Sequence, residues 1–391
     1  MQVRNGNRVS ARFLRTFRVN LADAIIGRFP CQRAWDAVDS RYKSLPGFAF
    51  GLIRVHLSRR SLVRRRIRNY MTAQFPDEET KSGEFKRQED AFREWISNDG
   101  STPYAAEAGR YHLYVSLACP WASRTVIFRK LKGLENAIGL TIVDPVRDDL
   151  GWAFRDPSGQ IPPGVPFEST DPINGFQFLS EAYTATDPDY RERVTVPVLW
   201  DTKTKRIVNN CEDDICRMFN DAFSDFALNK SVDLFPKEIQ ADHANLSDFI
   251  YDNVNNGVYR AGFATRQRPY ERACRRVFEA LDELEPRLSK SRYLFANRIV
   301  EADWRLFCTL VRFDPVYHGH FKCNLRRIID YPNLQGYLID LYQQPGIAET
   351  VNLDHIKRHY YMTHTAINPT RIVPIGPLLD LTKPHGRERM N

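Results

Sequence analysis

The sequence contains no uninterrupted apolar run of about 18 or more residues, the length that a membrane-spanning helix needs. It also shows no leader with an apolar central stretch of the secretory type. Cysteine is scarce and scattered, with seven residues at positions 31, 119, 211, 216, 274, 308 and 323. This odd number and wide spacing favour free thiols in a reducing compartment over a disulfide framework. We therefore expect neither a membrane span nor a secreted disulfide scaffold.

Zinc motifs are missing as well. Cys211 and Cys216 are five positions apart, and no histidine pair stands beside them at zinc spacing. His355 and His359 are four apart on an expected helix, which suits two zinc ligands, but no third ligand follows in a recognisable motif. We expect no bound metal.

Acidic residues are nearly absent from residues 1–70, which hold 16 Lys and Arg against Asp23, Asp36 and Asp39. The rest of the chain has 40 basic and 45 acidic residues, so the net charge of +8 comes from this extension. A nucleic-acid-binding protein needs a basic folded face, which the body of this chain does not offer. We expect no nucleic-acid partner.

Five arginines of the extension recur three or four positions apart, which places them on one side of a helix: Arg4, Arg8, Arg12, Arg15 and Arg18. An Arg-rich, acid-poor start is typical of a transit peptide and predicts a mitochondrial or other organellar protein. The basic cluster at 58–68 also suits a membrane surface or nuclear import. Alternatively, the extension is disordered or spurious, translation begins at Met71, and the protein is cytoplasmic.

The pattern from residue 83 to 225 predicts alternating strands and helices. We expect a short helix over 83–96, strands at 112–118 and 139–146, and a helix over 123–134 between these strands. Residues 157–175 have the Pro- and Gly-rich composition of a loop. A strand at 195–201 containing Pro197, a hairpin partner at 203–208 and a helix over 212–223 complete the order. This order is that of a thioredoxin-like α/β domain.

Residues 236–378 carry apolar side chains at a spacing of three to four, which predicts an all-helical second domain. At 391 residues the chain is long enough for two domains.

Cys119 stands between the first predicted strand and its helix. A helix start carries unpaired N–H groups and a partial positive charge, which lower thiol pKa values to about 3.5–7.5. Pro120 fits the first helical turn, where its missing N–H costs nothing. The pattern predicts a nucleophilic thiolate; the alternative is a buried structural cysteine.

Ala122 occupies the position where a CxxC oxidoreductase has its second cysteine. A lone nucleophilic thiol must form a mixed disulfide with a small thiol and be released by another. In a thioredoxin-like domain we expect the Val196–Pro197 bond to be cis, with the backbone of Val196 facing a peptide-like thiol.

Several long motifs occur in order from about residue 83 to 378. They are LACPWASRT, GWAF, RVTVPVLWD, NNGVYRAGFAT, EADWRLF, GHFKCNLRRIIDYPNL, DHIKRHYY and INPTRIVPIGP. With these motifs the chain resembles the glutathionyl-hydroquinone reductases, also called the Xi class of glutathione transferases. The resemblance implies a thioredoxin-like domain, an all-α glutathione-transferase C-terminal domain, a C-terminal segment returning over the active site, and a homodimer. It implies glutathione as co-substrate, quinone-derived small molecules as partners, and no bound cofactor.

The resemblance also assigns roles by position. Cys119 corresponds to the nucleophile, Trp152 to a glutathione-contacting tryptophan, and Val196, before Pro197, to the residue whose backbone pairs with the cysteinyl unit of glutathione. Tyr259 and Tyr360 correspond to tyrosines lining the hydroquinone pocket, where a phenol can donate the proton that the leaving ring carbon needs. Taken without the motifs, aromatic packing in a helical domain is the favoured interpretation of both tyrosines; within the motifs, the pocket role is favoured.

The sequence departs from the family at Cys211 and Glu212, where the family has a Glu-Ser pair that holds the γ-glutamyl end of glutathione. A like charge against that carboxylate costs on the order of ~2–4 kcal/mol. Either a shifted loop lets Glu212 replace the missing acid, or the enzyme uses a more cationic thiol, or glutathione binding is weakened.

These features predict an enzyme that removes glutathione from glutathionyl-hydroquinones through a Cys119 mixed disulfide. A second hypothesis is a broader Omega-like thioltransferase or dehydroascorbate reductase. A third is a catalytically degenerate glutathione-transferase-like scaffold, which the altered Cys211-Glu212 pair favours.

Overall fold

The computed structural model describes residues 76–147, 151–154 and 171–390. The basic extension 1–70, Met71 and most of the Pro- and Gly-rich segment 157–175 lie outside the described residues. The predictions about them therefore stay predictions.

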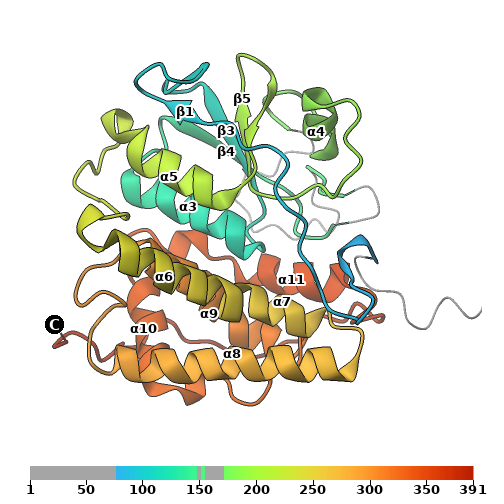
Figure 1. Cartoon of the computed structure of the whole chain (residues 1–391), viewed down its shortest axis with the longest axis vertical. Coiled ribbons are helices and arrows are strands. Elements are labelled where there is room, and N and C mark those ends of the chain that lie inside the picture. The colour runs from blue at the N-terminus through green and yellow to red at the C-terminus, as the bar shows by residue number, and fades with distance from the viewer. Residues whose placement is uncertain (1–75, 148–150, 155–170, 391) are drawn as a thin grey trace, which may run out of the picture. The chain divides into compact units, whose positions relative to one another are not determined.

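A four-stranded mixed sheet forms the first part of the described chain (Figure 1). Its strands are β3 (Tyr111–Val115), β4 (Ile138–Ile142), β5 (Val198–Asp201) and β6 (Arg206–Asn209), in the order β4-β3-β5-β6. β4 runs parallel to β3, and β5 runs antiparallel to both β3 and β6. Every residue of the central strand β3 is buried, as expected of a strand covered on both faces. A small parallel pair, β1 (Ile96–Ser97) and β2 (Tyr104–Ala105), precedes the sheet.

Three helices accompany the sheet: α3 (Pro120–Lys132), α4 (Ser180–Thr186) and α5 (Glu212–Asp221). α3 links the parallel strands β3 and β4, and it ends at Gly133, whose positive φ of 65° lets it cap the helix. α3 and α5 pack side by side between the sheet and the helical part that follows (Figure 1).

The second part is helical. Its helices are α6 (Gln240–Ile250), α7 (Asn256–Gly262), α8 (Gln267–Leu288), α9 (Glu301–Arg312), α10 (Pro332–Tyr342) and α11 (Leu353–Thr363). π-helical turns follow α6 at Tyr251–Asn255 and α9 at Phe313–Tyr317. Short 3₁₀ turns lie at Pro76–Glu78, Ser224–Phe226, Lys237–Ile239, Ile328–Asp330 and Ala348–Thr350. Within the described ranges, no helix has the length and apolarity that crossing a membrane requires.

The predicted order, a thioredoxin-like sheet domain followed by an all-α domain, is confirmed. The predicted Val196–Pro197 cis bond is present. The boundaries 83–225 and 236–378 stay predictions.

The short helix predicted over 83–96 is wrong. Residues 83–95 run as an extended segment, because their backbone groups pair with distant parts of the chain instead of with each other. The Phe92 N–H donates to Asn210 Oδ1 at 2.9 Å, and the Glu94 N–H donates to the Val208 carbonyl at 3.0 Å. Tertiary pairing thus overrides the local apolar pattern.

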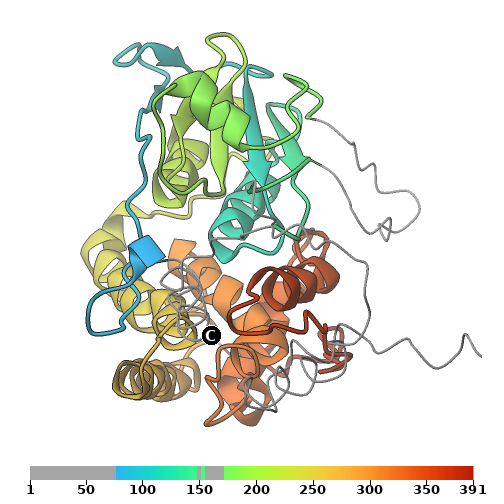
Figure 2. The ribbon, with the colours of Figure 1, turned by 90° about the vertical axis from the view of Figure 1, so that its right-hand side faces the viewer.

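The C-terminal segment consists of helix α11 and the tail that follows it (Figure 2). Helix α11 lines the central cavity, which agrees with a segment returning to the site. The tail beyond it packs on other helices: Gln343 Nε2 of the α10 end donates to the Leu381 carbonyl, and Arg387 Nη2 donates to the Leu288 carbonyl at the end of α8.

Candidate active site

Cys119 lies where the strand–cysteine–proline pattern predicts, directly before α3. Its backbone is extended (φ −76°, ψ 124°), Pro120 begins the helix, and the Ser123 N–H donates to the Cys119 carbonyl at 2.9 Å. The side chain is half-buried. The thiol therefore sits at a helix N-terminus and remains open to a small molecule.

The surroundings of the Cys119 thiol act on its pKa in both directions. Burial raises the pKa of the Cys119 thiol, while the N–H groups of Ala122 and Trp121 and the charges of Arg312 and Arg87 act to lower it. Cys119 Sγ donates to the Val196 carbonyl at 3.6 Å, a contact that stabilises the protonated form. Burial thus outweighs the helix terminus and the two arginines, so the thiol is less acidic than the helix start alone predicts. The prediction that Cys119 is the nucleophile stays a prediction.

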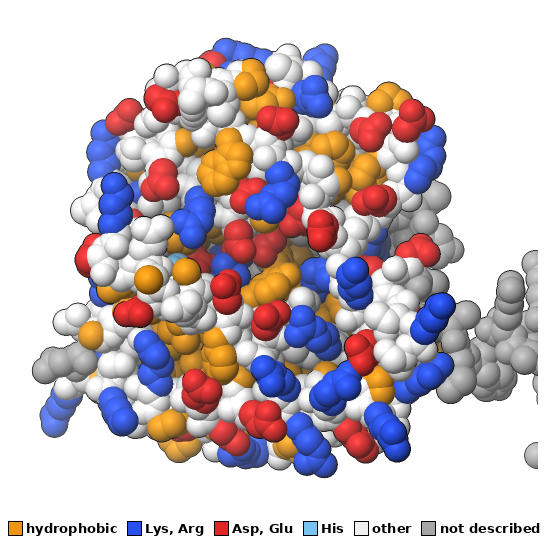
Figure 3. All heavy atoms as spheres, in the orientation of Figure 1, with side chains coloured by type: hydrophobic (Ala, Val, Ile, Leu, Met, Phe, Trp, Pro, Cys, Tyr) orange, Lys and Arg blue, Asp and Glu red, His pale blue; other side chains and the backbone are white. Residues whose placement is uncertain are grey.

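A cavity of about 450 Å³ opens beside Cys119. Seven of the residues singled out in the sequence line it together: Cys119, Trp152, Val196, Cys211, Glu212, Tyr259 and Tyr360. Pro197 is not part of the lining and follows Val196 through the cis peptide bond. Acidic side chains gather beside hydrophobic ones at the hollow in the middle of the face in Figure 3.

Trp152 forms one wall. Its side chain is buried, and its ring stacks on that of His359 from α11, with centroids 5.0 Å apart and an interplanar angle of 20°. His359 Nδ1 lies 2.7 Å from the Pro145 carbonyl, and burial lowers its pKa to about 3, so the ring is neutral. His359 thus lines the cavity, whereas from the sequence we had weighed it only as a metal ligand.

Two tyrosines form another part of the wall, and a third supports them. The hydroxyls of Tyr259 (α7) and Tyr360 (α11) hydrogen-bond to each other, and the Tyr317 hydroxyl lies 3.0 Å from that of Tyr360. Burial raises the pKa of Tyr259 to about 12 and that of Tyr360 well above its ordinary value. Both are therefore protonated phenols at neutral pH. Tyr317, fully buried in a π-helical turn, was not predicted.

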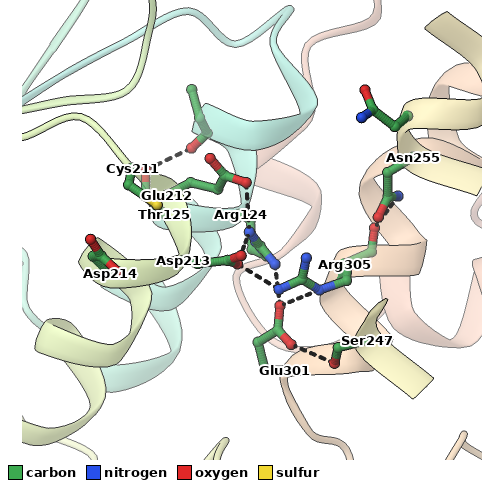
Figure 4. Close-up of polar contacts among 12 residues, drawn as sticks. Arg124, Thr125, Cys211, Glu212, Asp213, Asp214, Ser247, Asn255, Glu301 and Arg305 are labelled. Carbon is green, nitrogen blue, oxygen red and sulfur yellow. Dashed lines mark hydrogen bonds and ion pairs between the residues drawn. The ribbon is translucent and has the colours of Figure 1, made fainter. Parts of the chain in front are cut away.

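The far end of the cavity is acidic. Cys211 precedes α5 as Cys119 precedes α3, and Glu212 begins that helix. Glu212 Oε1 lies 3.0 Å from an Arg124 guanidinium nitrogen, and Asp213 pairs with Arg124 and, at 2.5 Å, with Arg305 (Figure 4). Glu212 is therefore held by α3 of its own chain.

Burial raises the pKa of Glu212 to about 8, with the Asp213 charge adding to the effect and Arg124 opposing it. Burial also raises the pKa of Asp90 to about 6, against a hydrogen bond from Cys211. Within the described residues, donor atoms of Asp90, Cys211 and Glu212 lie within 4.8 Å of one another. Three such donors fall short of the usual four-ligand metal site, and the carboxyl of Glu212 already contacts Arg124 at 3.0 Å.

Arg87 and Asp90 reach the cavity from the extended segment before β1, and sequence analysis missed both. The apolar spacing there suggested a helix, which hid their role. The signal that remains in the sequence is the polar run KRQED at 86–90 beside Phe85.

Comparisons with known proteins agree with this architecture. Residues 118–222 match the glutathione S-transferase N-terminal domain, and residues 267–339 match its C-terminal domain. The chain is 50% identical over 318 residues to glutathionyl-hydroquinone reductase YqjG of Escherichia coli, covering 80% of this chain and 94% of that protein. It is 45% identical to glutathionyl-hydroquinone reductase PcpF of Sphingobium chlorophenolicum, covering 77% and 92%.

Solved structures give the same result. The glutathione-bound structure of YqjG superimposes with a TM-score of 0.71 at 51% identity, covering 76% of this chain and 96% of that chain. The Xi glutathione S-transferase of Phanerochaete chrysosporium superimposes with a TM-score of 0.71 at 49% identity, covering 75% and 98%.

Proposed function

Because the chain belongs to the glutathionyl-hydroquinone reductases, the Xi class of glutathione transferases, we propose that it uses glutathione to reduce glutathionyl-hydroquinones to hydroquinones. The observation that supports this most is that one cavity is lined by two protonated phenols and by a helix-start thiol whose helix has no acid in its first turn. A nucleophile and a proton donor are the two groups that the reaction needs.

In the first half-reaction, the Cys119 thiolate attacks the sulfur of the glutathionyl substituent. A sulfur–sulfur bond forms, and the carbon–sulfur bond breaks with its electrons left on the ring carbon. That carbon takes a proton from a phenol, for which Tyr259 is our candidate, because Tyr259 faces both the cavity and Trp121, which follows the thiol in α3. The hydroquinone leaves, and Cys119 carries glutathione as a mixed disulfide.

In the second half-reaction, a free glutathione gives its thiol proton to the tyrosinate and attacks the mixed disulfide. Oxidised glutathione leaves, and Cys119 returns to the thiolate. Ala122 makes this second glutathione necessary, since no neighbouring thiol in the helix can displace the first.

Glutathione would lie between Trp152 and Val196, with its γ-glutamyl end toward α5. The Cys119–Val196 contact places the proposed reacting sulfur beside the backbone that would pair with the cysteinyl unit. Cys211 and Glu212 would face the γ-glutamyl end, and Glu212 is already committed to Arg124. We therefore expect this protein to bind the γ-glutamyl end of glutathione differently from its relatives.

A substrate panel tests the proposal. Purified protein is given glutathione with glutathionyl-menadiol, hydroxyethyl disulfide or dehydroascorbate, and the release of menadiol or oxidised glutathione is followed. We expect glutathionyl-menadiol to be turned over with the highest kcat/KM. Preference for either of the other substrates would favour the Omega-like thioltransferase. Absence of turnover on all three would favour the degenerate scaffold.

We further propose that residues 1–70 direct the protein to a mitochondrion or another organelle. Fusion of this segment to a fluorescent protein tests the idea: organellar fluorescence supports it, and diffuse cytoplasmic fluorescence favours translation from Met71. The proposed homodimer is tested by light scattering of the purified protein, which should give twice the mass of one chain.

A further inference from the structure

Arg87 is a permanent cation inside the cavity that the reaction scheme above leaves unused. Its Nε donates to Asn256 Oδ1 at 3.0 Å, and its buried Nη2 has no hydrogen-bond partner among the described residues. Its guanidinium carbon lies 3.8 Å from the centre of the Trp121 ring and 4.9 Å from that of Tyr259. These rings hold the guanidinium by cation–π contacts, which are strongest where water is excluded.

Arg312 also acts on the thiol but has a different role. Its guanidinium donates to the carbonyls of Leu117, Ala118 and Cys308 at 2.8–2.9 Å. It also contacts the Cys119 carbonyl and Ser123 Oγ. Arg312 is saturated with neutral acceptors and holds the turn between β3 and α3, whereas Arg87 keeps an unused donor.

The proposed chemistry moves one negative charge. Before the first step it resides on Cys119 Sγ. When the ring carbon takes the proton of Tyr259, the carbon–sulfur and oxygen–hydrogen bonds break, the sulfur–sulfur and carbon–hydrogen bonds form, and the charge resides on the Tyr259 oxygen. The proton of the incoming glutathione then neutralises Tyr259, and the charge returns to Cys119 as oxidised glutathione leaves.

We propose that Arg87 balances this charge throughout the cycle, as a positioning residue that stabilises the Cys119 thiolate at the start and the Tyr259 phenolate after proton transfer. The inference rests on the proposed function for the role of Tyr259. The Arg87 guanidinium makes cation–π contacts with the rings of Trp121 and Tyr259. Trp121 follows the thiol by two residues, and Tyr259 is the proposed proton donor itself. Arg87 and the two groups that carry the charge in turn line one cavity, and a fixed cation there needs no rearrangement during the reaction.

The electrostatics of both groups agree with this placement. Burial raises the pKa of Cys119 and of Tyr259, and the charge of Arg87 opposes the rise at each. The other groups acting on Cys119 are the Trp121 and Ala122 N–H groups of α3, Arg312 of α9 and the Val196 carbonyl before β5. Tyr259 of α7 and Cys308 of α9 also interact electrostatically with the thiol.

The test measures the ionisation of Cys119 directly. The rate of its alkylation by iodoacetamide, read by peptide mass spectrometry, is followed against pH in wild type and in Arg87→Met, Arg87→Gln and Arg87→Lys. We expect the methionine and glutamine variants to raise the apparent pKa by about one pH unit and the lysine variant to stay near wild type. Arg191→Met is the matched control, because Arg191 is 72% exposed and outside the cavity lining.

Turnover of glutathionyl-menadiol at pH 7 supplies the second readout. In Arg87→Met, kcat/KM should fall by about tenfold, because a pKa that is one unit higher leaves about one tenth of the thiolate. The KM for glutathione should not rise to match. An unchanged alkylation profile in both neutral variants would overturn the inference, as would a lysine variant that behaves like methionine. A rise in KM for glutathione with an unchanged profile would identify Arg87 as a binding residue instead, which also overturns it.

The two proposals fail separately. If wild type turns over none of the hydroquinone conjugates, the proposed function fails while the alkylation profiles still decide whether Arg87 acts on the thiol. Circular dichroism of each variant separates misfolding from a charge effect, and the glutamine variant decides the question if the methionine variant does not fold.

Discussion

Two helices of the sheet domain begin in the same way and have opposite surroundings. α3 starts after Cys119 and α5 after Cys211, and both cysteines have extended backbones without a side-chain hydrogen bond to the helix. Both line one cavity. A helix N-terminus by itself would make either thiol acidic.

The next residues separate them. The first turn of α3 has no acid, whereas that of α5 has Glu212, Asp213 and Asp214. Burial raises the pKa of both thiols, but at Cys119 the nearby charges are arginines that oppose the rise, and at Cys211 they include Glu212 and Asp90, which add to it. Two thiols at equivalent helix starts thus differ in the charges around them, which oppose the rise in pKa at Cys119 and add to it at Cys211.

Replacing each cysteine in turn by alanine should give the largest effect and tests the difference between the two helix starts. We expect Cys119→Ala to reduce turnover of glutathionyl-menadiol to the uncatalysed background. Cys211→Ala should keep kcat close to that of wild type and show its effect in KM, since its thiol lies at the binding end. Steady-state kinetics of both variants check this. Loss of kcat in Cys211→Ala together with retained kcat in Cys119→Ala would reverse the assignment.

The phenol at the thiol end gives the next largest effect. Tyr259→Phe should lower kcat on glutathionyl-menadiol by about 10²-fold, because general-acid catalysis by one group contributes this much. Turnover of hydroxyethyl disulfide should be nearly unaffected, since its leaving thiolate needs no carbon protonation. An equal loss on both substrates would assign Tyr259 to binding or packing.

The arginine–carboxylate network under α5 gives a stability effect. Glu301 is buried and accepts from Arg124, from Arg305 Nε at 2.9 Å and from Ser247 Oγ at 3.2 Å (Figure 4). Glu301→Gln leaves Arg124 and Arg305 short of a counter-charge and should lower the free energy of unfolding by about 3 kcal/mol in urea titrations. Glu349→Gln, at an exposed ion pair with Lys130, is the control and should change it by less than about 1 kcal/mol.

The pH dependence of that stability has a defined sign. Burial raises the pKa of Glu301, but Arg305 and Arg124 more than offset this and hold it below its ordinary value. Its contribution is therefore present above the carboxyl's unfolded pKa and is lost as pH falls through the lower folded value. Unfolding free energies that are equal for wild type and Glu301→Gln at neutral pH would contradict the role given to the network.

The smallest effect concerns the acidic end of the cavity. Since burial raises the pKa of Glu212 to about 8, this side chain is mostly neutral at pH 7 and charged at pH 9. S-methylglutathione, which has no thiol to titrate, should bind roughly fivefold more weakly at pH 9 than at pH 7, because the ligand carboxylate then meets a like charge. Calorimetry with Glu212→Gln should show a smaller change; an identical change in both proteins would exclude Glu212 as its cause.

Local patterns predicted the position of Cys119, because strand, cysteine, proline and helix are contiguous in the sequence. The assignment of Tyr259 and Tyr360 to one pocket came only from the family resemblance, and their hydrogen bond was not predicted, since 101 positions separate them. Arg87 and Asp90 were missed, because their segment has the apolar spacing of a helix and is held extended by strands far along the chain.

The raised pKa of Cys119 could not be predicted from the sequence either. It depends on burial of the thiol by parts of the chain distant in the sequence, among them Val196, which lies 77 positions away. Periodicity identifies neighbours within one element, whereas the balance of burial against charge at a site depends on which elements the fold brings together.

The most direct test is to find the sulfur that accepts glutathione. The protein is mixed with an equimolar amount of glutathionyl-menadiol and no free glutathione, and peptides are mapped by mass spectrometry under non-reducing conditions. Our account predicts one glutathione on the peptide of Cys119 and one menadiol released for each adduct. Release of menadiol with the adduct on Cys211, or with no adduct on either cysteine, would contradict it.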